Sequence, residues 1–206
     1  MQNLTIFRRL LIILAFFLVL HNANAQYGVR VSFQKGSGEL GYLLKPTVLT
    51  ELYYEGYTDY LFKYGASIGF APLETQLDTV PIGTIYMGDS TVLLPSWCVY
   101  KDMRQYSVGF QMEYKILDRN FSPVVGTDVY FHFIEYEEQY APQGTPSYND
   151  MLVVTIGILP RVGVCYNITD DLILQGGIGK SMAIDYKWNK FLYWKIYCGI
   201  KYYFQD

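Results

Sequence analysis

The sequence predicts an all-β fold, an eight-stranded antiparallel up-and-down transmembrane β-barrel, and three observations support this prediction. In residues 191–204, large apolar side chains alternate with small or polar ones. A period of two places the two sets on opposite faces of one strand. The same alternation recurs in seven earlier segments, and short and long connections alternate between the segments. Such an alternation of connections is typical of barrels that cross a membrane.

The expected strands follow one another along the whole chain after residue 26. They cover residues 27–33, 42–54, 60–70, 105–116, 122–136, 150–167, 172–184 and 191–204. Short turns are expected at 55–59, 117–120 and 167–171, longer connections at 35–41, 72–102 and 138–149, and a modest one at 185–190. A chain that enters from the periplasm places its odd-numbered connections outside the cell, and those are the longer ones here.

Volume indicates which face of the strands points into the barrel. The segment 106–116 carries six large residues at its even positions, and Gly, Ser, Gln and charged residues between them. Eight strands leave an interior just wide enough for ordinary side chains. The large set, repeated around the barrel, would overfill that space. We therefore expect the large apolar face to contact lipid, rather than to line the cavity of a soluble lipocalin-like barrel.

Residues 1–25 have the pattern of a cleavable export signal, so residues 26–206 form the expected barrel domain. Arg8 and Arg9 precede an apolar run at 10–20, and small residues at 23–25 suit a cleavage site. The remaining chain holds 14 basic and 19 acidic residues, a formal charge of −5, with no basic tract. Nucleic acid is therefore not an expected partner.

The three cysteines, an odd number, are expected to be free thiols.

The inward faces of the expected strands carry charges of both signs. The members of this lumen charge network are Arg30, Lys45, Glu51, Lys63, Glu113, Lys115, Asp128, His132, Arg161, Lys195 and Lys201. Charges in a narrow interior of low dielectric should pair across the lumen. We expect a packed ionic plug, and a water-filled passive pore for ions or small solutes is the alternative.

Aromatic residues near the strand ends are expected at the two membrane interfaces. Tyr27, Tyr114, Phe121, Tyr166, Tyr202 and Phe204 suit the periplasmic side, and Phe70, Tyr106, Phe133 and Trp194 suit the outer side. Lys180 breaks the apolar pattern, because its parity points it toward lipid. Either it lies at the outer rim or a bulge at Gly176–Gly177 turns it inward.

His132 is the one histidine left after cleavage of the signal, and it is the only candidate for hydrolytic or lipid-modifying chemistry. It should face the lumen beside Asp128 and Tyr130, but its own strand offers no neighbouring serine. A nucleophile would have to come from another strand. No Cys/His cluster has metal-ligand spacing. We therefore expect no catalysis, no metal and no cofactor.

The connection 72–102 is the best candidate for a partner-binding surface. Loops on rigid scaffolds carry recognition, and 31 residues without secondary structure would be unusual. The segment could extend as a hairpin above the membrane or fold into the mouth of the barrel. A partner-binding or secretion-accessory role through this loop is one hypothesis, and a purely structural barrel is the other.

With these features, the chain resembles the small outer-membrane β-barrel family common in the Bacteroidota. The Gly-rich inward faces, residues 160–164 and the final strand carry the resemblance, and Gly199, Tyr202 and Phe204 resemble the C-terminal signal of the barrel-assembly machinery. Tyr197 departs from that motif, which begins with a polar residue. The resemblance implies an outer-membrane location with periplasmic N- and C-termini, surrounded by lipid and lipopolysaccharide, and says little about activity.

Overall fold

The computed structural model describes residues 26–37, 44–57, 61–76, 80–86, 93–141, 147–185 and 190–203. These residues form nine strands: β1 Gln26–Ser37, β2 Thr47–Tyr57, β3 Phe62–Pro72, β4 Val80–Tyr86, β5 Leu93–Lys115, β6 Phe121–Ala141, β7 Ser147–Asn167, β8 Leu172–Asp185 and β9 Lys190–Tyr203. No helix in this part of the chain is long and apolar enough to cross a membrane.

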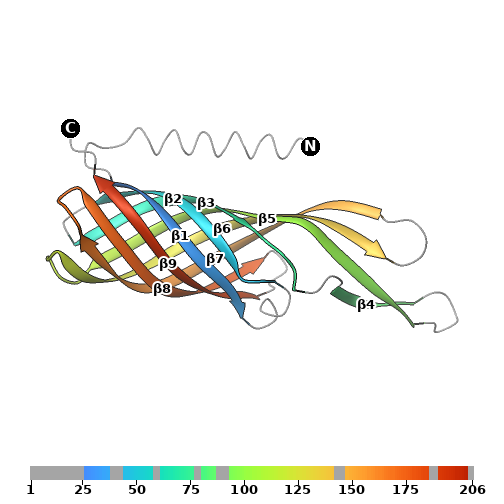
Figure 1. Ribbon diagram of the computed structural model, residues 1–206. Coiled ribbons are helices and arrows are strands. Elements are labelled where there is room, and N and C mark those ends of the chain that lie inside the picture. Colours follow the sequence, from blue (N-terminus) through green and yellow to red (C-terminus); the bar gives the residue numbers. More distant parts are fainter. Residues whose placement is uncertain are drawn as a thin grey trace.

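Eight of the strands form a closed antiparallel barrel. Each pairs with its sequence neighbour in the barrel, β1 pairs with β9, and β3 pairs with β5 to complete the ring. Figure 1 shows the barrel with the start of β1 and the end of β9 at the same end. We call this the turn end, because the short connections 116–120 and 168–171 lie there. The opposite end is the loop end. The predicted fold class is confirmed.

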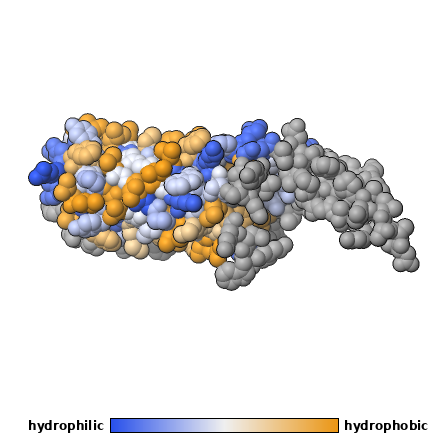
Figure 2. Space-filling view, turned by 90° about the horizontal axis from the view of Figure 1, so that it is seen from below, coloured by the Kyte–Doolittle hydropathy of each residue, from blue (hydrophilic) through white to orange (hydrophobic). Residues whose placement is uncertain are grey.

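The barrel is apolar outside and polar inside. In β9, Trp194, Ile196 and Ile200 are 44–54% exposed, whereas Lys195 and Lys201, at the alternate positions, are at most 1% exposed. Figure 2 shows apolar residues spread over the barrel wall. Val29, Val31, Phe110, Met112, Ile158 and Val162 are exposed in the same way on other strands. The predicted orientation of the two faces is therefore the observed one.

A four-stranded sheet continues from the loop end, beyond the barrel. β4 lies outside the ring and pairs with the first residues of β5. These residues of β5 pair with the last residues of β6, which in turn pair with the first residues of β7 (Figure 1). A bulge lies between Lys101 and Arg104, and Asp102 has a φ of 48°. Pairing of β5 with β3 ends at Arg104. The bulge therefore marks where β5 leaves the barrel wall, since bulges bend the strand that carries them. We call this sheet the extension.

Several sequence-based boundaries are wrong. The strand expected at 42–54 begins at Thr47 and continues to Tyr57, into the expected turn 55–59. The connection 72–102 contains β4 and the first ten residues of β5. Its hairpin extends from the barrel, one of the two alternatives raised by its length. The expected signal 1–25 and Phe204 lie outside the described residues.

Lys180 points outward, and no bulge turns it inward. The registers of β8 with β7 and with β9 are regular through Gly176 and Gly177.

Cys165 is buried and Cys198 is exposed, and both are free thiols.

Candidate functional site

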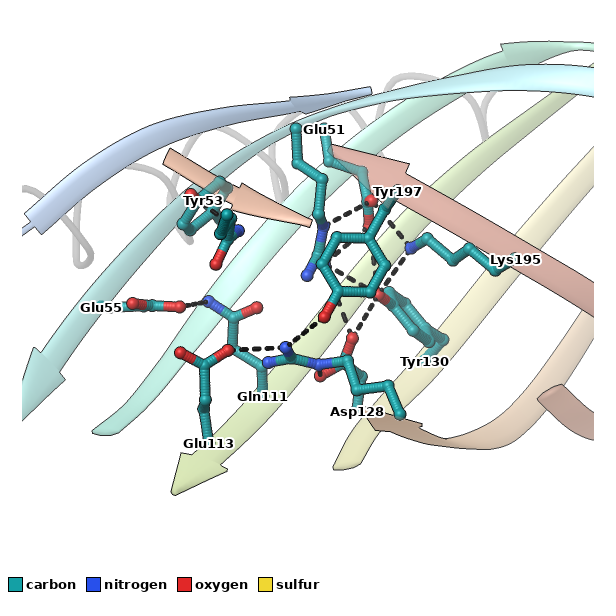
Figure 3. Close-up of polar contacts among 12 residues, drawn as sticks. Glu51, Tyr53, Glu55, Gln111, Glu113, Asp128, Tyr130, Lys195 and Tyr197 are labelled. Atoms are coloured by element: carbon teal, nitrogen blue, oxygen red, sulfur yellow. Dashed lines mark hydrogen bonds and ion pairs between the residues drawn. The ribbon is translucent and has the colours of Figure 1, made fainter. Parts of the chain in front are cut away.

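Buried charged residues converge in the middle of the barrel (Figure 3). We define the lumen plug as these eight charged residues and one tyrosine: Arg30, Glu51, Glu55, Glu113, Asp128, Tyr130, Arg161, Lys195 and Lys201. Each is at most 3% exposed. They come from β1, β2, β5, β6, β7 and β9, because the inward parity of each strand carries a polar residue at this level. The plug therefore connects opposite walls of the barrel.

The half of the plug nearer the loop end is centred on Glu51. Its carboxylate accepts hydrogen bonds from Arg30 Nε at 2.9 Å and from Ser32 Oγ at 3.1 Å. Lys195 Nζ lies 2.7 Å from the same carboxylate. The Tyr130 hydroxyl donates to Asp128 at 2.8 Å and accepts from Lys195 at 2.8 Å. Tyr130 thus links charges that lie on different walls.

Arg161 joins the two halves of the plug. Its Nε donates to Asp128 at 2.9 Å and its Nη1 donates to Glu113 at 2.6 Å. Lys201 Nζ then bridges Glu113 at 3.2 Å and Glu55 at 2.6 Å. Since every ion has an opposite charge within hydrogen-bond distance, these buried groups are compensated as low-dielectric interiors require.

The plug is balanced in charge, with four cations and four carboxylates. A passing ion would have to break several of these short contacts and leave a buried charge unpaired, which costs about 3–5 kcal/mol for each broken pair. Lys63 and Lys115 are also buried, outside this balanced set. Lys63 donates to Gln26 Oε1 at 3.0 Å. The arrangement favours a closed lumen over a conducting one.

Glycines make room for the tyrosine rings of the lumen. A Cβ added to Gly109 would lie 2.6 Å from the Tyr130 ring, and one added to Gly163 would lie 2.8 Å from the Tyr197 hydroxyl. Tyr197 lies between two guanidinium groups, 5.3 Å from that of Arg30 and 5.6 Å from that of Arg161. Small residues and large rings therefore fit together in the interior, because each glycine leaves the space that a neighbouring ring or hydroxyl occupies.

The structure places the residues of the expected lumen charge network inside the barrel, with one exception. Lys45 precedes β2, and its exposed ammonium pairs with Glu74 at 3.0 Å. The expectation for Lys45 is wrong because the inward parity of β2 starts at Thr47 and does not reach back to Lys45. Conversely, Glu55 belongs to the plug although the sequence assigned it to a turn. An expected strand one residue longer, 42–55, would have placed Glu55 on the inward face.

His132 stacks on the Tyr130 ring of the plug, with the ring centres 5.4 Å apart, and lies on the side nearer the loop end. Its Nδ1 is 3.0 Å from Ser107 Oγ and 3.1 Å from Gln105 Nε2, and its Nε2 is 2.8 Å from the Tyr193 hydroxyl. Ser107 pairs directly with His132 across β5 and β6. Sequence periodicity could not find this neighbour, because it depends on the register between strands.

The His132 cluster does not have the geometry of an open active site. Ser107 and His132 are 2% and 3% exposed. No ion pair between His132 and a described carboxylate is present, so a third group that orients the imidazole by charge is missing from the residues described. The adjacent cavity, lined partly by Gln34, Gln105 and His132, holds about 50 Å³, enough for a few water molecules. In the described chain, no group of three or more His, Cys, Asp or Glu could hold a metal ion.

Outward-facing aromatic residues lie in two rows. At the turn end, Tyr27 pairs with Tyr202, and Phe121 pairs with Tyr166. Tyr114 belongs to the same end, because it pairs with the first residue of β3. Nearer the loop end, Phe70, Tyr106 and Phe133 are consecutive neighbours across β3, β5 and β6. Trp194 lies toward the loop end of β9.

Gly199, expected as part of the assembly signal, faces the lumen, where a Cβ would lie 2.8 Å from the Val29 carbonyl oxygen.

Comparison with solved structures gives the class of this barrel. Neisserial surface protein A aligns with 87% of this chain and 97% of its own, at 14% identity and a TM-score of 0.55. The fold is that of the small outer-membrane barrels. A major outer membrane protein from Thermus thermophilus aligns with 87% of this chain and 99% of its own, at 14% identity and a TM-score of 0.50. No family model and no curated protein matches the sequence, so membership of the Bacteroidota family stays a prediction.

Proposed function

We propose that this protein is an integral outer-membrane barrel with a closed lumen, and that it has a structural or partner-binding role. The lumen plug is the observation that carries this proposal. Its ion pairs link six of the eight barrel strands at 2.6–3.6 Å, and two of them, Lys201–Glu113 and Arg30–Asp128, join strands on opposite sides of the lumen. Its residues are at most 3% exposed. A barrel filled in this way is a rigid scaffold, and any contact with a partner takes place on its outer surfaces and loops.

Electrical recording in planar lipid bilayers tests the closed lumen. We expect the wild-type protein to give no steady unitary currents. Replacing Glu51 and Glu113 together with alanine removes two central carboxylates, and we expect this variant to admit ions. Steady, large currents from the wild-type protein would favour the alternative, a passive pore.

A matched control separates loss of the plug from a general effect of charge removal. Glu74→Ala removes a carboxylate from an exposed ion pair outside the lumen, and its recordings should match those of the wild type. All variants should be shown to be folded by their heat-dependent mobility in gels and by circular dichroism, so that a misfolded channel is not mistaken for an open one.

The extension supplies the surface for a partner. In the described residues, β4 pairs with β5 alone, and β7 pairs with β8 only from Thr155 onward. The sheet therefore has two edges, formed by β4 and by residues 147–154 of β7. Unpaired strand edges present backbone donors and acceptors that an extended segment of another chain can use. This feature supports a partner-binding or secretion-accessory role through the region 72–102.

Deletion of residues 76–98 tests this role. We expect partners that copurify with the wild-type protein from crosslinked membranes to be lost from the deletion variant, while the barrel still inserts. The same partners in both preparations would contradict binding through the extension and leave a purely structural barrel.

A further inference from the structure

Three outward-facing residues form a row across neighbouring strands near the loop end. Lys35 of β1 pairs with Trp194 of β9, and Trp194 pairs on its other side with Lys180 of β8. All three side chains are exposed. The Lys180 ammonium lies 5.3 Å from the centre of the Trp194 ring. Two basic side chains therefore flank one indole on the surface that faces lipid.

The depth of this row follows from the strand registers. Tyr27, Tyr202 and Leu172 form the corresponding row at the turn end, eight residues from Lys35, Trp194 and Lys180 along each strand. Eight residues of a tilted strand rise about 20 Å along the barrel axis. The apolar band of an outer-membrane barrel is about 25 Å tall. The two lysines are therefore close enough to the outer boundary for their ammonium groups to reach the lipid headgroups.

The outward residues between the two rows carry no charge. They are Val29, Val31, Phe33, Leu174, Gly176, Ile178, Ile196, Cys198 and Ile200. The lysines thus lie at the first level where the wall of these three strands becomes polar.

Neither lysine has a carboxylate partner in the described part of the chain. The ion pairs found there within 4.0 Å do not include Lys35 or Lys180, although Lys45 pairs with Glu74 just beyond the barrel. A cation at the edge of a lipid phase that lacks an internal counterion attracts an anion from its surroundings. Adjacent strands are about 4.8 Å apart, so Lys35 and Lys180 each lie one strand away from Trp194, on opposite sides of it. Because both lysine side chains are long, one small anion over Trp194 can contact both ammonium groups.

We propose that Lys35, Trp194 and Lys180 bind the phosphate of a phosphorylated glycolipid headgroup in the outer leaflet. The two ammonium groups would contact the phosphate oxygens, and the indole would pack at the level of the sugar. This site rests on the proposed outer-membrane location, but it does not depend on whether the lumen is closed. It gives a role to Lys180, the one charged residue that interrupts the outward apolar pattern of β8.

Binding of labelled bisphosphorylated lipid A to the folded protein in neutral detergent micelles tests the proposal. Each lysine near a membrane surface contributes about fivefold to the binding of an anionic headgroup. We expect Lys35→Gln or Lys180→Gln to weaken binding about fivefold, and the double variant about 30-fold. Lipid A without its phosphates should bind the wild type as weakly as bisphosphorylated lipid A binds the double variant.

The control variant carries Lys45→Gln and Lys101→Gln, which remove the same charge from exposed positions outside the row. It should bind lipid A as the wild type does. Equal weakening in this control, or wild-type binding by the double variant, would overturn the site. Competition by millimolar inorganic phosphate would overturn its assignment to a lipid headgroup. Bilayer recordings of the same double variant test the closed lumen separately and should stay silent.

Discussion

At the scale of single residues, the interior depends on groups that satisfy one another across the lumen. Tyr130 contacts Arg30, Asp128 and Lys195 through one hydroxyl. Alternation along β6 predicts that Tyr130 points inward, but it cannot show which charges the hydroxyl meets. A tyrosine on the charged face of a strand is nevertheless a usable signal, because a buried hydroxyl needs partners.

We expect Glu51→Ala to lower the free energy of unfolding by about 3–5 kcal/mol, because it leaves Arg30 and Lys195 as buried cations without their shared carboxylate. Glu74→Ala, which breaks an exposed pair, should change it by less than about 1 kcal/mol. Urea titration of the protein in lipid vesicles measures both values. Equal effects of the two substitutions would show that the plug contributes no more than a surface ion pair.

At the scale of the element, β9 combines the two requirements of the barrel wall in one strand. Its even positions 194–202 face lipid and its odd positions 193–201 face the lumen. Such strict alternation makes one-residue slippage costly, because it would move Lys195 and Lys201 into lipid. The same logic fails at the start of β2, where Lys45 has inward parity and lies outside the strand.

Depth along β9 should determine the effect of a new charge. Cys198 lies midway between Trp194 and Tyr202 on the lipid-facing side, and we expect Cys198→Lys to destabilise the barrel by about 2–4 kcal/mol. Tyr202→Lys, at the boundary on the same face, should cost at most about 1 kcal/mol. Unfolding in vesicles compares the two. A larger loss at Tyr202 than at Cys198 would mean that the membrane does not lie between the two aromatic rows.

At the scale of the whole molecule, β5, β6 and β7 run without a break from the barrel into the extension. The ring closes where β3 pairs with β5, from Phe62 with Tyr114 to Pro72 with Arg104. The bulge at Asp102 lies just beyond this seam. The plug lies wholly inside the ring, so its ion pairs do not depend on the extension.

Deleting residues 76–98 should therefore leave the barrel intact. We expect the variant to keep the heat-dependent gel mobility of the folded protein, with a free energy of unfolding within about 1 kcal/mol of the wild type, because the deleted residues make none of the contacts of the plug. Loss of the folded form in this variant would show that the extension is needed to close the ring.

Within the strands, the alternation of residues was enough to predict which side chains face lipid and which face the lumen, because the two-residue period of a strand is a local property of the backbone. The sequence also predicted eight membrane strands and the side of the barrel with the longer connections. The neighbours of these side chains could be found only in the folded barrel, where Glu55 meets Lys201, Ser107 meets His132, and Lys35 and Lys180 lie on either side of Trp194. These neighbours depend on the register between strands and on where each strand begins. Both the register and the strand starts are fixed when the whole ring closes, so the alternation within a single strand does not reveal them.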